Sequence, residues 1–209
     1  MWIIRPPTES RQNVSLGFGV KLPTGNPRQT DTVTSATGTR TVVVDQSIQP
    51  GDGGYGFTLD AQGYKSISFF TLYGSGIYLF NPRNTNGVPT GRSRPSEAIM
   101  SVPDQYLCRF GGIVPAPKLR NLTLSMGIRG EGIPVRDAFG KSEGFRRPGF
   151  ALSLDPGLIF TQGGNQWSVN VPVAVHRDRK RSVPDIIDGK WGDAAFADYL
   201  VLVGFSRRF

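Results

Sequence analysis

The last eleven residues, YLVLVGFSRRF (residues 199–209), decide the fold class. Counting back from the end in steps of two selects Phe209, Arg207, Phe205, Val203, Val201 and Tyr199. Successive side chains of a β-strand point to opposite faces, so one face of this segment is apolar except at Arg207. The pattern predicts a terminal strand with one apolar face.

Composition extends this prediction to the whole chain. The 209 residues include 27 Gly and 16 Pro, which is too many for an ordinary helical bundle and predicts one all-β domain over residues 1–209. Each apolar run is broken within a few positions, so no window approaches the roughly 18 apolar residues of a membrane-spanning helix. The start, MWIIRPPTES, lacks the features of a secretory signal peptide.

Alternation selects eight segments bounded by Gly, Pro, Asn or Asp. They are residues 13–23, 55–63, 67–80, 105–115, 122–131, 149–160, 166–176 and 199–209. Short turns are predicted around Gly63 to Lys65, at Pro117 and Lys118, and in TQGGN (residues 161–165). Pro156 and Pro172 lie inside two of the segments, and each predicts a bulge or a strand end because proline removes a ladder hydrogen bond.

The connections between these segments alternate between short and long. The long ones span residues 25–54, 81–104, 132–148 and 177–196, and all four fall at the same end of an up-and-down meander. Long loops at one end and short turns at the other are typical of an outer-membrane β-barrel. The sequence therefore predicts an antiparallel transmembrane barrel with about eight strands in this chain.

Strand length and aromatic placement agree with a membrane barrel. Tilted strands of roughly 9 to 11 residues span the hydrocarbon layer, and only a closed barrel pairs all backbone groups there. Phe209, with Phe205 nearby, is predicted to lie in a periplasmic aromatic girdle and to serve as an assembly signal. Phe160 and Trp167 should lie at the same height, and Tyr199 and Phe150 should mark the opposite rim. The alternative is that these rings fill the core of a soluble sandwich.

Several stretches of the chain resemble a known family. They are VSLGFGVKLPTGN (14–26), DQSIQPGDGGYGF (45–57), LYGSGIYLFNP (72–82), SVPDQYL (101–107) and the region from RSVPD (181–185) to the C-terminus. In this order they resemble bacterial outer-membrane barrel transporters associated with phenol degradation, of the MetA-pathway type. The resemblance implies passage of small aromatic or hydrophobic compounds and supplies no catalytic residues. It also implies a signal peptide and upstream strands, so residues 2–4 are expected to be the tail of a missing strand.

The face opposite the lipid lines the lumen of a barrel, and a charge on the lipid face costs about 2 to 4 kcal/mol at mid-membrane. Alternation therefore nominates ten lumen-lining residues: Lys21, Asp60, Arg109, Arg129, Glu131, Asp155, Asn170, His176, Asp198 and Arg208. They form either a polar pathway for solutes or a charge network that plugs a narrow interior. Leu200 and Leu202 point inward in the same register, which suits a packed interior or a pathway for apolar solutes.

The formal net charge is +8, and the densest basic run is HRDRKRS (residues 176–182). Interleaved aromatics and a groove, which a nucleic-acid site requires, are not evident in this run. Its candidate contacts with lipopolysaccharide phosphates are Arg177, Arg179, Lys180 and Arg181, because guanidinium and ammonium groups bind phosphate. A solvated loop is the alternative.

Enzymatic and metal chemistry find little support. His176 is the single histidine; Asp178 and Asp198 could orient it, but no nucleophile is fixed beside it. Asp185, Asp188 and Asp193 match no calcium-loop spacing. Cys108, the single cysteine, is expected to be a buried or lipid-facing apolar residue. SVPD occurs twice, at residues 101–104 and 182–185, and is interpreted as a local turn former.

Three functions remain open. The first is a bacterial outer-membrane channel for passive passage of small solutes, without a cofactor, metal or nucleic acid. Its expected partners are lipid, lipopolysaccharide and, through the terminal strand, the barrel-assembly machinery. The second is a sealed structural or surface-interaction barrel. The third is a soluble ligand-binding barrel, which requires the apolar face to point inward.

Overall fold

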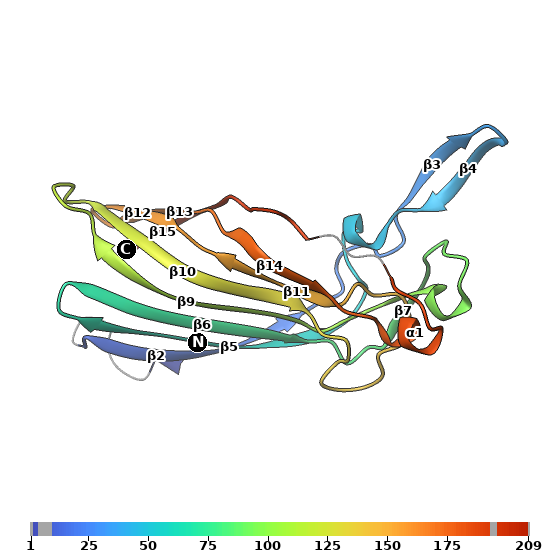
Figure 1. Cartoon of the computed structure of the whole chain (residues 1–209), viewed down its shortest axis with the longest axis horizontal. Helices are drawn as coiled ribbons and strands as arrows, with labels where there is room; N and C mark the ends of the chain where they lie inside the picture. The colour runs from blue at the N-terminus through green and yellow to red at the C-terminus, as the bar shows by residue number, and fades with distance from the viewer. Residues whose placement is uncertain (1, 4–9, 193–195, 209) are drawn as a thin grey trace.

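The computed structural model describes residues 2–3, 10–192 and 196–208. A long, curled antiparallel sheet runs through the molecule, and the long connections gather at one end of it, which we call the loop end (Figure 1). The opposite end holds only short turns and is called the turn end. This arrangement confirms the all-β prediction and the prediction that all four long connections share one end.

The sheet follows the predicted meander of eight segments, two of which are divided. Its strand order is β1-β2-β5-β6-β9-β10, followed by β11 and β12 and then by β13, β14 and β15, with every neighbouring pair antiparallel. The strands are β1 (Trp2–Ile3), β2 (Gln12–Lys21), β5 (Gly56–Ile67), β6 (Phe70–Phe80), β9 (Gln105–Pro115), β10 (Leu122–Ile133), β11 (Gly149–Leu154), β12 (Gly157–Gln162), β13 (Asn165–Asn170), β14 (Val173–Arg179) and β15 (Leu202–Arg207).

Both predicted proline interruptions are confirmed. Pro156 separates β11 from β12, and Pro172 separates β13 from β14. The two breaks lie next to each other, because the amide of Val171 donates a hydrogen bond of 2.9 Å to the carbonyl of Pro156. A proline on each of two paired strands therefore interrupts the ladder at one level instead of at two.

The turn predicted around Gly63 to Lys65 is wrong. Strand β5 continues through these residues to Ile67, and the chain turns at Ser68, which has a positive φ of 54°. Gly63 lies inside the strand, where a Cβ would stand 3.0 Å from the carbonyl oxygen of Asn13 on β2. Close strand approach, rather than a turn, accounts for this glycine.

The described strands do not close into a barrel. β15 pairs only with β13 among the described strands, and the outer edge of β2 pairs only with the two residues of β1. Among the described residues the sheet is a curled half-barrel with two edges that do not meet, which fits a β-barrel, while the expected upstream strands stay a prediction. Closure depends on pairing between the first and last strands, which local alternation does not report.

The two faces of the sheet divide as the alternation predicts. On β2, Leu16 is 47% exposed and Phe18 and Val20 are each 66% exposed, whereas Asn13 and Ser15 are only 8% exposed. One hollow on the face of Ser15 is lined by Gln62 of β5 together with Ser206 of β15, so the sheet curls around this side. The convex outer face is mainly apolar, whereas the concave inner face carries both polar and apolar side chains. Cys108 is exposed on the outer face.

The long connections fold into a compact cap at the loop end. They contain β3 (Thr30–Ser35), β4 (Gly38–Val43), η1 (Gln46–Ile48), β7 (Thr85–Pro89), η2 (Pro95–Glu97), β8 (Ile99–Ser101) and α1 (Val183–Ile187). Their small core holds Val88, Met100, Val102 and Phe145, each at most 2% exposed. The β3–β4 hairpin projects away from this cap (Figure 1).

Buried ion pairs stabilise the cap. Arg146 binds Asp137 at 2.6 Å, with both side chains at most 1% exposed, and donates two hydrogen bonds to Ser101. Asp104 accepts hydrogen bonds from the amides of Asn81 at 2.6 Å and Ala138 at 2.8 Å. Since these partners lie in different connections, the cap joins segments that are distant in the chain.

The two SVPD copies do more than form turns. Ser182 and Asp185 make a capping box at the start of α1, and Asp185 also binds the distant Arg94. Ser101 and Asp104 bind the distant residues just described. All four side chains are at most 1% exposed, because each serves as a buried hydrogen-bonding anchor.

Candidate functional site

The inner face carries a charged cluster halfway along the strands. Asp155 is fully buried and accepts hydrogen bonds from Arg109 Nε at 2.8 Å and from Asn170 Nδ2 at 3.1 Å. A second guanidinium nitrogen of Arg109, Nη2, lies 2.5 Å from the carboxylate of Asp155. The break at Pro156 places Asp155 between β11 and β12, where its backbone still exchanges hydrogen bonds with Gly127.

A second ion pair lies beside the first. Arg129 stands directly opposite Arg109 on the neighbouring strand and binds Glu131 at 2.6 Å. Two like charges in register would destabilise the sheet, and here each arginine has its own carboxylate. We call Arg109, Arg129, Glu131 and Asp155 the charged layer.

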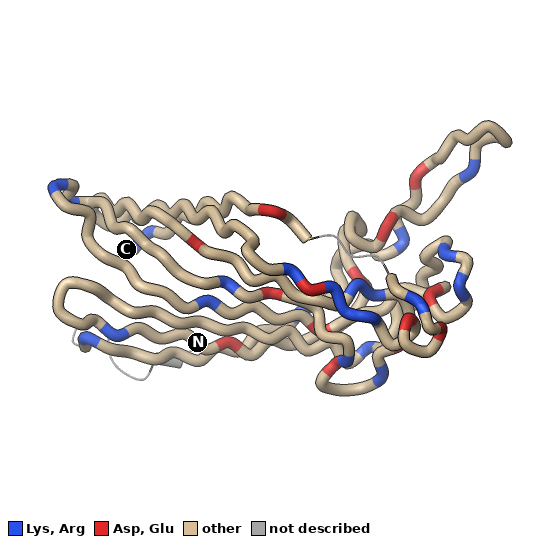
Figure 2. The backbone as a smooth tube through the Cα atoms, in the orientation of Figure 1, with Lys and Arg blue, Asp and Glu red and all other residues tan. Residues whose placement is uncertain are grey.

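Charges are sparse along the rest of the sheet. Figure 2 shows most lysine, arginine, aspartate and glutamate residues at the loop end, with few along the strands. The charged layer therefore divides the inner face into an upper part toward the loop end and a lower part toward the turn end.

The upper part contains a hollow of about 650 Å³. Its lining is mostly apolar and includes Ile77, Leu79, Leu107, Ile133, Phe196 and Leu200. Glu131 and Arg147 add charge at its margin. Leu200 thus lies on the inner side as predicted, in a space that suits an apolar solute.

The lower part contains two adjoining hollows of about 570 and 390 Å³, which share Gln62, Tyr73 and Arg109. Amide and hydroxyl side chains predominate in both. The side chains of the lower part are therefore mostly polar, whereas those of the upper hollow are mostly apolar.

Of the other nominated lumen residues, Asn170 binds Asp155, and the rest lie apart from the charged layer. Lys21 forms an ion pair with Asp52 and a hydrogen bond of 2.8 Å with Asn81, near the cap. Asp60 lies on the inner face above Gly17, where a Cβ would collide with its carboxylate. Asp198 lies in a connection and pairs with Arg177.

Arg208 is the last described residue, and its amide bonds the carbonyl of Gly164 at 2.8 Å.

His176 lies on the opposite face from the one predicted. A register shift between Leu152 and Ser153 places His176 opposite Leu152, which is on the outer face. Its ring lies 5.7 Å from that of Phe150. A β-bulge shifts alternation by one residue, and this accounts for the error.

Aromatic side chains form a cluster at the turn end of the outer face. Phe160 is paired with Trp167, as predicted, and Trp167 with Phe205, whose ring centroid is 4.5 Å away. Phe209 lies outside the described residues. Toward the loop end, stacked or tilted contacts join Phe18, Phe57, Phe80, Tyr78 and Tyr106, a belt that the sequence analysis did not identify.

The predicted rim pair does not share one level. Tyr199 is bridged to Val173, whereas Phe150 stands opposite Asp178, five residues further along the same strand. The loop-end belt defined by Tyr78 and Tyr106 replaces this pair, because Phe150 and Tyr106 are both paired with Gly132.

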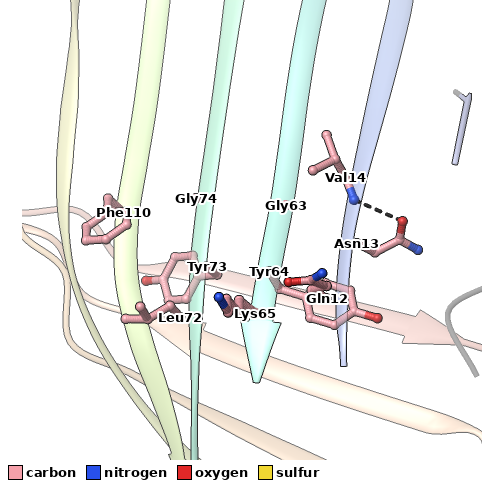
Figure 3. A pocket seen from close by; sticks show the side chains of 10 residues that line it. All are labelled: Gln12, Asn13, Val14, Gly63, Tyr64, Lys65, Leu72, Tyr73, Gly74 and Phe110. Carbon is pink, nitrogen blue, oxygen red and sulfur yellow. Dashed lines mark hydrogen bonds between the residues drawn. The ribbon is translucent and has the colours of Figure 1, made fainter. Parts of the chain in front are cut away.

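A further hollow of about 610 Å³ borders the outer face where Gly63 and Gly74 are paired. Figure 3 shows Val14 and Phe110 to either side of the two glycines, with Leu72 below. Two missing side chains in one row create this gap in the apolar surface.

The basic run is largely occupied within the chain. Arg177 pairs with Asp198, and Lys180 pairs with Asp178. Arg179 donates to the carbonyl of Gly192 at 3.1 Å, and Arg181 donates to two backbone carbonyls, at 2.7 and 2.8 Å. All four basic side chains of the run therefore have partners within the chain.

Among the described residues, neither a triad around His176 nor a metal centre is assembled. The two carboxylates that could have oriented His176 are bound by Lys180 and Arg177. Within residues 2–3, 10–192 and 196–208, no group of three or more His, Cys, Asp or Glu side chains could hold a metal ion. No helix in the same ranges is long and apolar enough to cross a membrane.

The acidic residues of the last long connection serve structural roles. Arg94 binds Asp185 at 3.0 Å and approaches Asp188 at 3.9 Å, while Asp193 lies outside the described residues. Burial raises the pKa of Asp185, but hydrogen bonds from Ser182 and Arg94 outweigh it and leave the pKa below its usual value. In the first long connection, the hydrogen bond from Arg147 holds the pKa of Asp45 well below its ordinary range.

Four neutral residues of the inner face were not nominated from the sequence. Tyr73 lies under the guanidinium of Arg109, 5.9 Å from ring centroid to Cζ, and Gln62, Gln166 and Ser168 line the lower hollows. The alternation that nominated the charged residues, Asn170, Leu200 and Leu202 also selects these side chains, so the signal was present but was not applied to them.

No protein-family model matches this chain, and no curated protein matches it. The resemblance to phenol-associated outer-membrane transporters therefore stays a prediction.

Proposed function

We propose that this protein is a bacterial outer-membrane β-barrel that passes small solutes passively. The observation that carries the proposal is the division of the curled sheet into a convex face with exposed apolar side chains and a concave face that holds the charged layer and the hollows. Aromatic clusters toward both ends of the outer face, and long connections at one end only, agree with a sheet that crosses a bilayer.

The same division argues against a soluble ligand-binding barrel. Such a barrel would bury its apolar face, yet Phe18 and Val20 on the outer face are each two-thirds exposed. A contiguous apolar surface of this kind is typical of contact with lipid or a partner.

Apolar solutes fit the upper hollow. Its aliphatic and aromatic lining and its volume of about 650 Å³ are within the usual range of small-molecule sites. The resemblance to transporters of aromatic compounds points to the same class of solute.

A sealed barrel is the second candidate, and the charged layer favours it. Asp155 is fully buried in its pair with Arg109, and such pairs across a narrow interior would obstruct passage. In either case, lipid requires that the free edges of β2 and β15 be paired, so closure by further strands or by a second copy belongs to the proposal.

The proposal also includes lipopolysaccharide contact through Arg177, Arg179, Lys180 and Arg181 and recognition of the terminal strand by the barrel-assembly machinery.

Single-channel conductance of the refolded chain in a planar bilayer tests the proposal. Discrete current steps are expected. Ser75→Trp, which places a ring on the inner face beside Arg109, should lower the step size, whereas Leu72→Trp on the outer face of the same strand should leave it unchanged. Silence from a folded, inserted chain whose sheet edges are paired, by a second copy or by restored upstream strands, would reject an open pore and favour the sealed barrel.

A further inference from the structure

The lower part of the inner face is built from neutral polar groups. Six side chains that line its larger hollow are Gln62, Tyr73, Ser125, Gln166, Ser168 and Asn170. The smaller hollow adds Asn13, Ser15 and Ser75. Amides and hydroxyls both donate and accept hydrogen bonds, so this lining matches a solute that does the same.

The lining offers no free counter-charge. Of the described residues that border the two hollows, only Arg109 is charged, and Asp155 neutralises it at 2.5 Å. An ionic solute would lose its hydration without gaining an opposite charge. An uncharged solute avoids this loss.

Two buried hydroxyls in this region have no hydrogen-bond partner among the described residues. They are the hydroxyls of Tyr73 and Ser125. Buried polar groups are usually paired, and exceptions indicate a partner from outside the protein chain. Tyr73 and Ser125 both line the larger hollow, so a polar solute bound there would lie beside them.

Two glycines leave open space beside polar side chains of the site, and two isoleucines provide apolar contact. A Cβ on Gly157 would stand 2.3 Å from Asn170 Nδ2, and one on Gly204 would stand 2.6 Å from Ser168 Oγ. Ile113 and Ile159 line the same hollow. Sugars present apolar C–H faces between their hydroxyl groups, and such faces pack against aliphatic side chains.

We propose that the lower hollows form a binding site for uncharged, hydroxyl-rich solutes of monosaccharide size. Their volumes of about 570 and 390 Å³ are within the range of small-molecule sites. The site deepens the proposed function, on which it rests for a route by which solute reaches it. The inner face would then have a polar binding site between the apolar upper hollow and the turn end.

Equilibrium dialysis of the refolded full chain in detergent micelles tests this site without requiring a pore. Three radiolabelled probes share one carbon skeleton: glucose is neutral, gluconate is an anion and glucosamine is a cation. Glucose should bind about tenfold more tightly than either ion. Leaving one buried polar group without a hydrogen-bond partner costs enough binding free energy to give a ratio of this size.

A double variant and a matched control complete the experiment. Gln166→Leu with Ser168→Ala removes two polar groups of the site and should weaken glucose binding by about tenfold. Val169→Ala, which follows Ser168 on the same strand but lies on the outer face, should bind glucose like the wild type. Circular dichroism and gel mobility confirm that both variants fold.

Equal binding of all three probes, or unchanged glucose binding by the double variant, overturns the site. Glucose binding without current would support the binding site and reject the pore. Current without glucose binding would support the pore and overturn the binding site.

Discussion

Replacing Asp155 by asparagine tests whether the charged layer stabilises the sheet. The substitution preserves shape but removes the charge that faces Arg109 at 2.8 Å (Nε) and 2.5 Å (Nη2). The backbone hydrogen bonds between Asp155 and Gly127, at 2.8 and 3.2 Å, do not involve the side chain and should persist. Any loss of stability therefore reports on the ion pair.

The expected loss can be estimated from burial. Breaking a buried ion pair typically costs about 3 to 5 kcal/mol. The Arg109 side chain is 27% exposed, so partial solvation of the unpaired guanidinium places the expected loss near the lower end, at about 3 kcal/mol.

Urea unfolding of the refolded chain in micelles, followed by tryptophan fluorescence, measures this loss. A double-mutant cycle with Arg109→Gln should give a coupling energy of about 1.5 to 3 kcal/mol. Asp60→Asn is the matched control, because Asp60 also lies on the inner face but its carboxylate has no ion pair among the described residues. A coupling energy within about 0.5 kcal/mol of zero, or equal losses for both aspartates, would refute the reasoning.

Three further predictions concern close strand contact, the cap and pH. Gly111→Ala should lower the free energy of unfolding in urea by about 1 to 3 kcal/mol, because a Cβ there would lie 2.5 Å from the carbonyl oxygen of Met126. Gly112→Ala should change it little, because the nearest atom to its Cβ is 3.9 Å away. Equal effects of the two substitutions would contradict the strand spacing. Arg146→Ala leaves a buried carboxylate unpaired and should make the cap sensitive to limited proteolysis while the strands stay protected; an unchanged digestion pattern would count against the buried pair. The pKa of Asp185 is lower in the folded chain than in the unfolded one, so its contribution to stability is present at neutral pH and is lost as the pH falls below about 4. Hydrogen exchange of α1 amides, corrected for intrinsic rates, should therefore accelerate between pH 6 and pH 3 in the wild type and change less in Asp185→Asn, and an identical pH response in both would contradict this assignment.

Local patterns alone predicted much of this protein. The period-two alternation from Val14 to Val20 identified a strand and assigned its apolar and polar faces, because neighbouring side chains of any strand point to opposite sides. Pro156 and Pro172 likewise predicted interruptions from backbone chemistry that needs no partner. The lengths of the connections located the loop end. Each of these inferences depends on residues that are close in sequence.

The tertiary structure decided everything that depends on how distant strands pair. The bulge on β14 moved His176 to the outer face, and the approach of β2 explained Gly63 as a strand residue instead of a turn. Asp155 is nominated by alternation, but its burial depends on Arg109 of β9 and Asn170 of β13, which are 46 and 15 residues away in the chain. Alternation reports the face of a side chain but not its opposite neighbour, because register, curvature and the pairing of the first and last strands are set by contacts between segments far apart in sequence.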